Sequence, residues 1–220
     1  MPVELSGSDR LLCLADDALR MLAAGRAGRE TQRTGRPCPR PPADAAAGEL
    51  APAERRETGA LMRVNHAGEI AAQGLYHGQS LAAADPALRA HLRQAAREEG
   101  DHLAWCRERL DALGERPSRL DPLWYAGAVA IGAAAAWVGD RTSLGFVVET
   151  ERQVEAHLTG HLARLPAAAV ADRAVLERMR ADEVEHGAAA QARGAVELPL
   201  PLRGLMRLAG RVMTQLAHRG

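Results

Sequence analysis

The chain has 220 residues, 47% of them hydrophobic, which is enough to bury the core of one large domain or two small ones. Its 28 basic residues balance 28 acidic ones, so no global positive charge favours a nucleic-acid partner. Aromatic residues make up only 3% while alanine is abundant, and this composition favours closely packed helices over a β-sandwich.

Helical periodicity starts near the N-terminus and returns in longer segments after a break. Residues 9–24 predict a first helix, and residues 25–52, rich in Gly, Pro and Arg, predict a linker. Further helices are expected at residues 54–84, 86–114, 123–138, 142–165, 167–193 and 202–218. Four of these are about 25 residues long, which predicts an all-α four-helix bundle. We therefore expect an N-terminal helix and flexible linker over 1–50 and one helical domain over 51–220.

The three cysteines, Cys13, Cys38 and Cys106, are far apart and lack the Cys-x-x-Cys spacing of zinc or rubredoxin-type iron sites. A reducing cytosol is therefore expected. The N-terminus does not show a basic start followed by a long apolar run, and the sequence contains no stretch of roughly 20 apolar residues. Neither a signal peptide nor a transmembrane helix is expected.

Two stretches, "REEGDHLAW" and "MRADEVEHGA", each place a glutamate three residues before a histidine. Residues three apart on a helix point the same way, so each pair can offer a carboxylate and an imidazole to one ion. A further glutamate precedes each pair by 30 or 32 residues. The candidate ligands are Glu69, Glu99 and His102 in the first set and Glu151, Glu183 and His186 in the second. A Glu followed by Glu-x-x-His, twice over, is the ligand pattern of di-iron four-helix bundles.

The helical faces support a buried site. Glu151 shares its stripe with Leu144, Val147 and Leu158, and Glu99 and Glu183 also fall among apolar residues. Four carboxylates facing one core would repel one another unless cations neutralise them. Carboxylates and imidazoles without thiolates suit iron or manganese better than structural zinc. The competing interpretation is surface glutamates and hydrogen-bonded histidines in an arginine-rich helical protein.

The motifs "LMRVNHAGEIAAQGLYHGQ", "EEGDHLAW", "PLWYAGAVAIGAAAAWVGD", "VVETERQVEAHL" and "MRADEVEHG" resemble those of the demethoxyubiquinone hydroxylases, di-iron monooxygenases of ubiquinone biosynthesis. The resemblance covers about residues 54–220. It implies a ferritin-like fold, two Fe ions per chain held by the same six ligands, O2 as oxidant and an external reductant such as NADH. The implied substrate is a polyprenylated demethoxyquinol, whose ring is hydroxylated in a late step of ubiquinone biosynthesis.

The resemblance also implies roles for residues near the metals. His157 and Tyr76 stand where the family has a His and a Tyr that handle protons or electrons, although ordinary packing is an alternative for Tyr76. Glu98 and Asp182 each precede a ligand glutamate, and such acids commonly orient a ligating imidazole through its other N–H. Solvated surface acids are the alternative for these two.

A polyprenyl quinol resides in the bilayer, so contact with membrane lipid is expected. Residues 123–138 are uncharged, with Trp124, Tyr125 and Trp137 near the ends, and are too short to span a membrane. Residues 202–218 place an apolar face opposite Arg203, Arg207 and Arg211, which fits an interfacial helix on anionic lipid. Packing against the bundle is the alternative for both helices. We expect a peripheral protein on the cytoplasmic face of the cell membrane.

Two other function classes stay open at this stage. A ferritin-like iron-binding or ferroxidase protein would use the same ligand set, and a metal-free helical interaction protein would use none of it. Assembly as a homo-oligomer or within a ubiquinone-biosynthesis complex also stays open.

Overall fold

The computed structural model describes residues 8–9, 12, 15–16, 19, 33–43 and 48–220. Its named elements are all helices: α2 (Pro52–Ala82), α3 (Pro86–Leu113), α4 (Asp121–Val138), α5 (Asp140–Arg164), α6 (Val170–Ala192) and α7 (Leu200–Arg219). The prediction of an all-α fold is confirmed. The first helix predicted over residues 9–24 lies largely outside the described residues.

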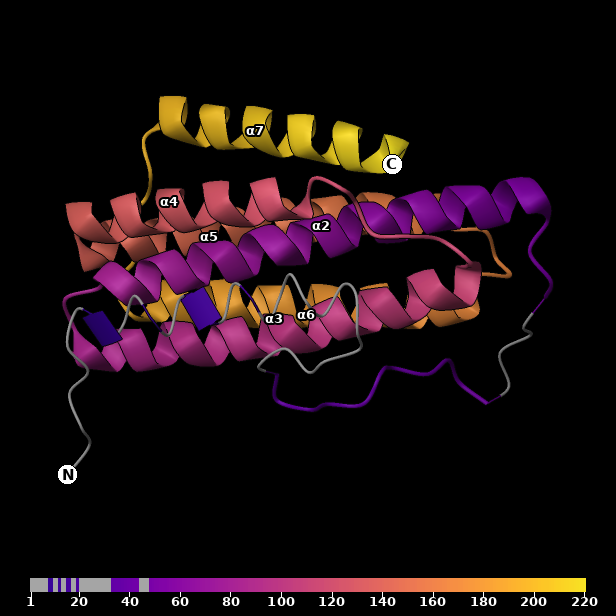
Figure 1. The fold of residues 1–220 in the computed structure, drawn as a ribbon, viewed down its shortest axis with the longest axis horizontal. Helices are drawn as coiled ribbons and strands as arrows, with labels where there is room; N and C mark the ends of the chain where they lie inside the picture. Colours follow the sequence, from indigo (N-terminus) through magenta and orange to yellow (C-terminus); the bar gives the residue numbers. More distant parts are fainter. Residues whose placement is uncertain (1–7, 10–11, 13–14, 17–18, 20–32, 44–47) are drawn as a thin grey trace.

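Helices α2, α3, α5 and α6 form the bundle, in which α2 and α6 each pack against α3 and α5. Helix α4 packs against α2 and α5 on the outside of the bundle, and α7 lies over the same two helices (Figure 1). Among the described residues, no helix is both long and apolar enough to cross a bilayer.

Local signals explain most helix ends. The Asp85 carboxylate caps α3 by accepting the Ala87 N–H at 2.9 Å, and Gly114 ends the helix in the left-handed region at φ 74°. Helices α4 and α7 begin about two residues before the predicted starts. Each has a proline in its first turn, where a backbone N–H would have no partner within the helix, so the proline does not prevent the helix from starting there. Helix α6 begins three residues later than predicted, after a turn in which Ala169 N–H donates to Pro166 O at 3.0 Å.

Two glycines bring α2 and α4 into close contact. A Cβ on Gly78 would lie 2.1 Å from the Val129 carbonyl oxygen, and a Cβ on Gly132 would lie 2.2 Å from the Leu75 carbonyl oxygen. Larger residues at either position would force the two backbones apart. The outer side of α4 stays exposed, and the Trp137 side chain is 89% accessible.

Helix α7 differs in detail from the expected single apolar face. Leu202 and Met206 pack against the bundle, whereas Leu205 and Leu208 point outward and are exposed. Arg203 does not face solvent opposite the apolar stripe, because its Nε donates to Glu149 of α5 at 3.0 Å. The helix therefore docks on the bundle and still presents apolar side chains outward.

The apolar core of the bundle is divided by a polar layer. One cluster includes Leu61, Trp105, Leu158 and Met179, and the other includes Tyr76, Leu92, Leu144 and Ala190. Along each bundle helix, buried glutamates lie between the residues of the two clusters. A layer of charge inside a core is costly unless it is compensated, so this layer is the candidate functional site.

Candidate metal centre

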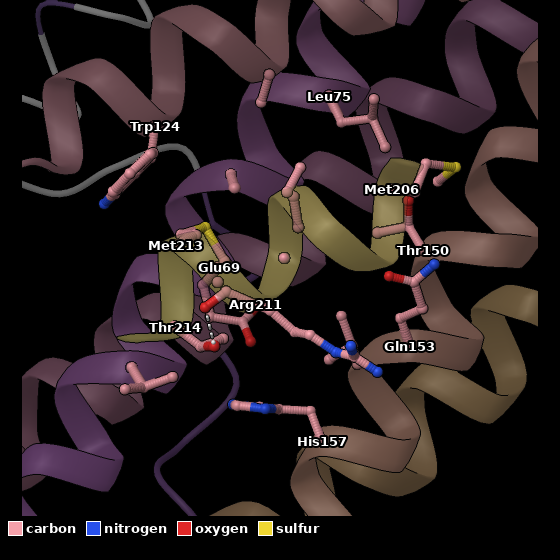
Figure 2. A pocket seen from close by; sticks show the side chains of 18 of the residues that line it. Glu69, Leu75, Trp124, Thr150, Gln153, His157, Met206, Arg211, Met213 and Thr214 are labelled. Carbon is pink, nitrogen blue, oxygen red and sulfur yellow. Dashed lines mark hydrogen bonds between the residues drawn. The ribbon is translucent and has the colours of Figure 1, made fainter. Parts of the chain in front are cut away.

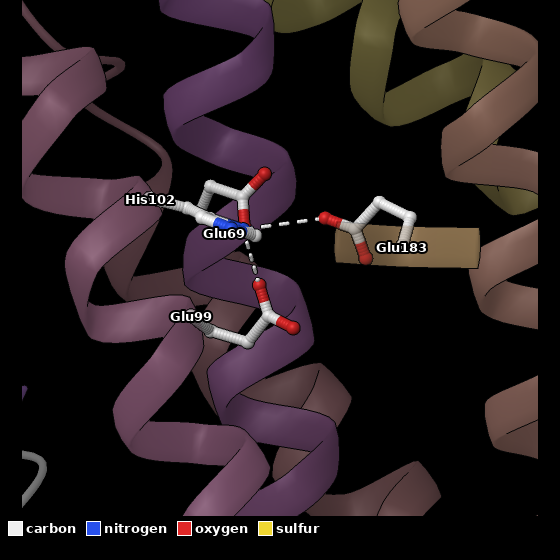
Figure 3. A group of neighbouring side chains, drawn as sticks. All are labelled: Glu69, Glu99, His102 and Glu183. Atoms are coloured by element: carbon white, nitrogen blue, oxygen red, sulfur yellow. Dashed lines mark hydrogen bonds and ion pairs between the residues drawn. The ribbon is translucent and has the colours of Figure 1, made fainter. Parts of the chain in front are cut away.

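The polar layer contains all six candidate ligands. Each bundle helix contributes: Glu69 from α2, Glu99 and His102 from α3, Glu151 from α5, and Glu183 and His186 from α6. The candidates form two groups, and within each group the possible ligand atoms all lie within 4.8 Å of one another. The first group (the His102 half) is Glu69, Glu99, His102 and Glu183, drawn in Figure 3, and the second (the His186 half) is Glu99, Glu151, Glu183 and His186. Glu99 and Glu183 belong to both groups, so the geometry offers two adjacent positions that share two carboxylates.

Each imidazole points its Nδ1 atom at the carboxylates. Nδ1 of His102 lies 2.9 Å from Oε2 of Glu99, 3.3 Å from Oε1 of Glu183 and 3.6 Å from Oε2 of Glu69. Nδ1 of His186 lies 3.0 Å from Oε1 of Glu99 and 3.7 Å from Oε2 of Glu183. These are the nitrogens that would bind ions held between the carboxylates.

Burial and crowding of like charges shift the pKa values of the cluster. Burial, joined by the neighbouring carboxylates, raises the pKa of Glu69 and of Glu151 well above the usual value. Burial disfavours the imidazolium form of His102, but Glu99 and then Asp182 outweigh it and raise the His102 pKa well above its usual value. In Glu99 and Glu183 burial is outweighed by the contacts with the two imidazoles, which lower the pKa, so the shifts run in opposite directions within one cluster.

The hydrogen bonding of the cluster fits a metal better than a closed proton network. Four of its buried polar atoms have no partner with hydrogen-bond geometry, although imidazole nitrogens approach two of the oxygens to 3.0 and 3.3 Å: Glu99 Oε1, Glu151 Oε2, Glu183 Oε1 and His186 Nδ1. Buried carboxylate oxygens and imidazole nitrogens normally find partners. An oxygen-rich donor set with two imidazoles suits iron or manganese, so the residues fit a pair of such ions.

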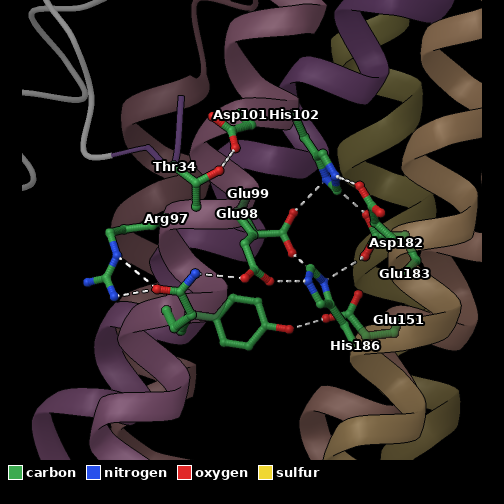
Figure 4. A network of polar contacts seen from close by, with 12 residues as sticks. Thr34, Arg97, Glu98, Glu99, Asp101, His102, Glu151, Asp182, Glu183 and His186 are labelled. Atoms are coloured by element: carbon green, nitrogen blue, oxygen red, sulfur yellow. Dashed lines mark hydrogen bonds and ion pairs between the residues drawn. The ribbon is translucent and has the colours of Figure 1, made fainter. Parts of the chain in front are cut away.

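Each imidazole is held by an acid from the other Glu-x-x-His helix (Figure 4). Asp182 on α6 lies 2.9 Å from Nε2 of His102 on α3, and Glu98 on α3 lies 2.8 Å from Nε2 of His186 on α6. The structure thus places both acids where the sequence analysis expected imidazole-orienting partners. Each contact leaves Nδ1 free to face the carboxylates.

Tyr76 and His157 lie in different surroundings. The buried Tyr76 hydroxyl donates to Oε1 of Glu151, so this residue touches the ligand set directly. His157 is not part of either donor group and lines a neighbouring cavity. Its ring lies beside that of His161, with the centroids 3.9 Å apart and the ring planes tilted by 58°. His161 in turn lies 2.8 Å from the Asn65 side-chain oxygen through Nδ1.

A cavity of about 790 Å³ leads to the cluster between α2, α4, α5 and α7. Its lining is mainly apolar and includes Trp124, Phe146 and Met213. Figure 2 shows Glu69 among the cavity side chains, with those of α5 and α7 around it. Glu69 is the one candidate ligand among the lining residues of this cavity, so the His102 half is the half that the cavity reaches.

Residues 1–50 carry no functional motif, yet residues 34–36 contact α3 and α6 beside His102. One signal was available in the motif "EEGDH". Asp101 falls next to a ligand histidine on a largely buried helix, where a carboxylate needs a partner from elsewhere in the chain.

The fold and the cluster define a class: a helical bundle with a buried carboxylate–histidine layer of the kind that holds two metals in ferritin-like proteins. The family model described as "Ubiquinone biosynthesis protein COQ7" matches residues 56–217, and the chain belongs to this family. The predicted ferritin-like fold and the resemblance to the quinol hydroxylases are thereby confirmed.

Curated relatives match nearly the whole chain. A protein of Variovorax paradoxus (strain S110) is 57% identical over 211 residues, covering 96% of this chain and 97% of the relative. One from Paracidovorax citrulli (strain AAC00-1) is 58% identical, covering 96% and 98%. One from Burkholderia multivorans (strain ATCC 17616 / 249) is 54% identical, also covering 96% and 98%. Each of these relatives is named 3-demethoxyubiquinol 3-hydroxylase.

Proposed function

We propose that this chain is a 3-demethoxyubiquinol 3-hydroxylase, a di-iron monooxygenase that uses O2 to add a hydroxyl group to the quinol ring. The observation that carries the proposal is the position of Glu69, which belongs both to the buried donor cluster and to the lining of the apolar cavity. A ring placed in the cavity would meet the cluster at this residue. The names of the relatives supply the substrate.

The six donors would hold two iron ions, with Glu99 and Glu183 shared between them. When bound, the iron pair supplies the O2 activation and electron transfer that ring hydroxylation requires. The protein supplies the surroundings: the apolar cavity excludes water and orients the ring, and Tyr76 fixes Glu151 through its hydroxyl. An external reductant such as NADH provides the two electrons.

His157 stands at the cavity wall rather than at the metals, so its role is in proton handling near the substrate. Burial, aided by the nearby positive charge of Arg164, lowers its pKa to about 4, so the ring is neutral at physiological pH. A neutral imidazole can accept a hydrogen bond from a quinol hydroxyl and so hold the hydroxyl proton toward the cavity wall.

The substrate would enter from the membrane. Exposed apolar side chains lie on both helices that flank the cavity: Leu123 and Ile131 on α4, and Leu205, Leu208 and Val212 on α7. Such a patch on a peripheral protein fits the interfacial layer of a bilayer, where a polyprenylated quinol resides. These side chains support contact with a membrane, and the protein's location at the cytoplasmic face of the cell membrane stays a prediction.

The test supplies the iron-loaded protein with a short-tailed demethoxyquinone, NADH and isotopically labelled O2, and analyses the product by mass spectrometry. We expect one labelled oxygen atom in a new ring hydroxyl. Iron oxidation or peroxide release with the quinone unchanged, repeated after addition of an electron-transfer reductase, would contradict the proposal and favour a ferroxidase.

A further inference from the structure

Residues 34–36 (the strap) precede the bundle and lie against α3 beside His102. Figure 4 shows Thr34 pointing at Asp101. Their common target is Asp101, whose side chain is fully buried. The Thr34 hydroxyl donates to Oδ2 of Asp101, the Gly35 N–H donates to Oδ1 at 2.9 Å, and Nε of Arg36 donates to Oδ2 at 3.0 Å. The strap thus supplies three donors to a carboxylate that would otherwise be costly to bury.

The Arg36 side chain contacts α6 as well as α3. Its Nη1 donates to Oδ2 of Asp182 at 2.8 Å, the same oxygen that lies 2.9 Å from Nε2 of His102. The guanidinium carbon lies 5.0 Å from the centre of the Trp105 ring, and the Trp105 indole N–H donates to the Arg36 carbonyl oxygen at 3.2 Å. One side chain therefore joins both Glu-x-x-His helices, and it does so at the acid that orients a candidate ligand.

We propose that Arg36 is a positioning residue of the metal centre, and that the strap holds Asp182 and, through it, the imidazole of His102. The inference rests on the proposed function, because it assumes that the six donors hold two metal ions. Arg36 makes its polar contact with His102 at Nε2, 3.5 Å from Nη2, whereas Nδ1 is the nitrogen of His102 that faces the carboxylates. It therefore acts through Asp182.

The strap makes the two metal positions unequal. Glu98, the acid that holds His186, receives its other hydrogen bond from the Gln94 amide at 2.8 Å, within the same helix. Asp182 instead receives a guanidinium from outside the bundle, in a setting where its own side chain is only 3% exposed. Only the His102 half should depend on the strap, and that half is the one the cavity reaches.

The backbone of the strap is adapted to this contact. Gly35 has φ 83°, in the left-handed region that other residues rarely adopt, and its N–H points at Asp101 in that conformation. A Cβ at Gly35 would meet no atom within 4 Å. Alanine at this position would therefore disturb the conformation of the strap without introducing a clash or changing a charge.

The experiment loads the full chain with Fe²⁺ without oxygen and follows release of both ions to a colorimetric chelator. For Arg36→Ala we expect one of the two ions to leave about tenfold faster, and the other at the wild-type rate, because loss of an outer partner weakens the ligand it orients. The matched control is Arg178→Ala. Arg178 also pairs with Asp182, at 2.6 Å to Oδ1 and 3.3 Å to Oδ2, but it comes from the same helix and its side chain is 49% exposed, so both ions should leave at the wild-type rate.

Two further variants separate positioning from folding. Gly35→Ala should accelerate release of the same single ion by a smaller factor. Combining Arg36→Ala with Asp182→Asn should add no acceleration beyond Asp182→Asn alone, because both changes break the same chain of contacts. Gly35→Ala alone provides the test if Arg36→Ala proves too unstable to purify.

Unchanged release from Arg36→Ala, equal acceleration of both ions, or an equal effect of Arg178→Ala would each overturn the role of the strap and leave the metal centre intact. A wild-type chain that fails to retain two ions would instead overturn the proposed metal centre, and the strap inference with it.

Discussion

Glu99 and Glu183 differ from the other four candidate ligands because each lies within reach of both donor groups. Glu69 belongs to the His102 half alone, and Glu151 to the His186 half alone. The consequences of removing a carboxylate should therefore depend on which kind is removed, even though all four are buried.

We expect Glu183→Ala to lose both iron ions and Glu69→Ala to lose one, measured as iron per chain after desalting. Turnover should fall at least a hundredfold in both variants, because ring hydroxylation needs the pair. Glu185→Ala, on the same helix but exposed, is the control and should keep two ions. Full iron content in Glu183→Ala would contradict the shared-ligand assignment.

Removing the Tyr76 hydroxyl should weaken the His186 half. Tyr76→Phe leaves a buried Glu151 oxygen without its donor, and loss of such a partner typically lowers metal affinity about tenfold or more. The measurement is competition for Fe²⁺ against a chelator of known affinity. Equal affinity of variant and wild type for both ions would mean that Tyr76 serves packing alone.

The paired histidines beside the cavity predict a pH effect on folding. Burial and the nearby His157 lower the pKa of His161 to about 2, from an ordinary value of 6.5, so the folded protein keeps this ring neutral. Below pH 6.5 the unfolded chain binds a proton that the folded chain does not, so stability falls as the pH falls.

His161→Asn retains a side-chain N–H for Asn65 and removes this titration. Between pH 6.5 and 4.5 the free energy of unfolding of the metal-free variant should therefore fall less than that of the wild type, by up to about 1.4 kcal/mol per pH unit. Urea unfolding at several pH values measures the difference. Parallel pH profiles would show that His161 is not held neutral by the fold.

At the scale of single elements, the sequence predicted the bundle helices well because their signals are local. Apolar periodicity predicted α3 almost to the residue, and the three-residue spacing of Glu99 and His102 gave the two side chains a shared face. Helix ends next to prolines were displaced by a few residues, since periodicity alone does not show whether a proline starts a helix or precedes it.

The contact between α2 and α4 should be sensitive to a single methyl group. Gly78→Ala would place a Cβ against the Val129 carbonyl oxygen and should destabilise the protein by about 1–3 kcal/mol. Gly160→Ala on α5, where a Cβ meets nothing within 4 Å, should instead stabilise it by up to about 1 kcal/mol. Thermal unfolding of both variants checks the pair, and equal melting temperatures would contradict the close approach.

At the scale of the whole molecule, the strap, the cavity and the docking of α7 could not be predicted from the sequence. Arg36 meets Asp182 across 146 residues, and Arg203 meets Glu149 across 54. Contacts of this kind depend on how finished helices pack, and neither periodicity nor motif spacing records them. The cavity has the same origin, because four separate helices line it.

The outward side chains of α7 give the membrane proposal a direct test. Replacing Leu205, Leu208 and Val212 by glutamine should abolish flotation with liposomes that contain anionic lipid, while iron content stays at two per chain, because these residues face away from the cluster. The control is Gln153→Leu, a change inside the cavity, which should leave flotation intact. Undiminished flotation of the triple variant would refute α7 as the contact.

The crossed pairing of acids and imidazoles also bears on how the chain reaches its final state. The helix pair α2 and α3 carries His102 but not Asp182, and the pair α5 and α6 carries His186 but not Glu98. Neither helix pair can orient its own candidate ligands, so in the proposed metal centre high-affinity binding would become available only when the two pairs have docked. Metal retention is therefore a readout of completed assembly, and a chain cut between α3 and α5 should regain it only when both fragments are recombined.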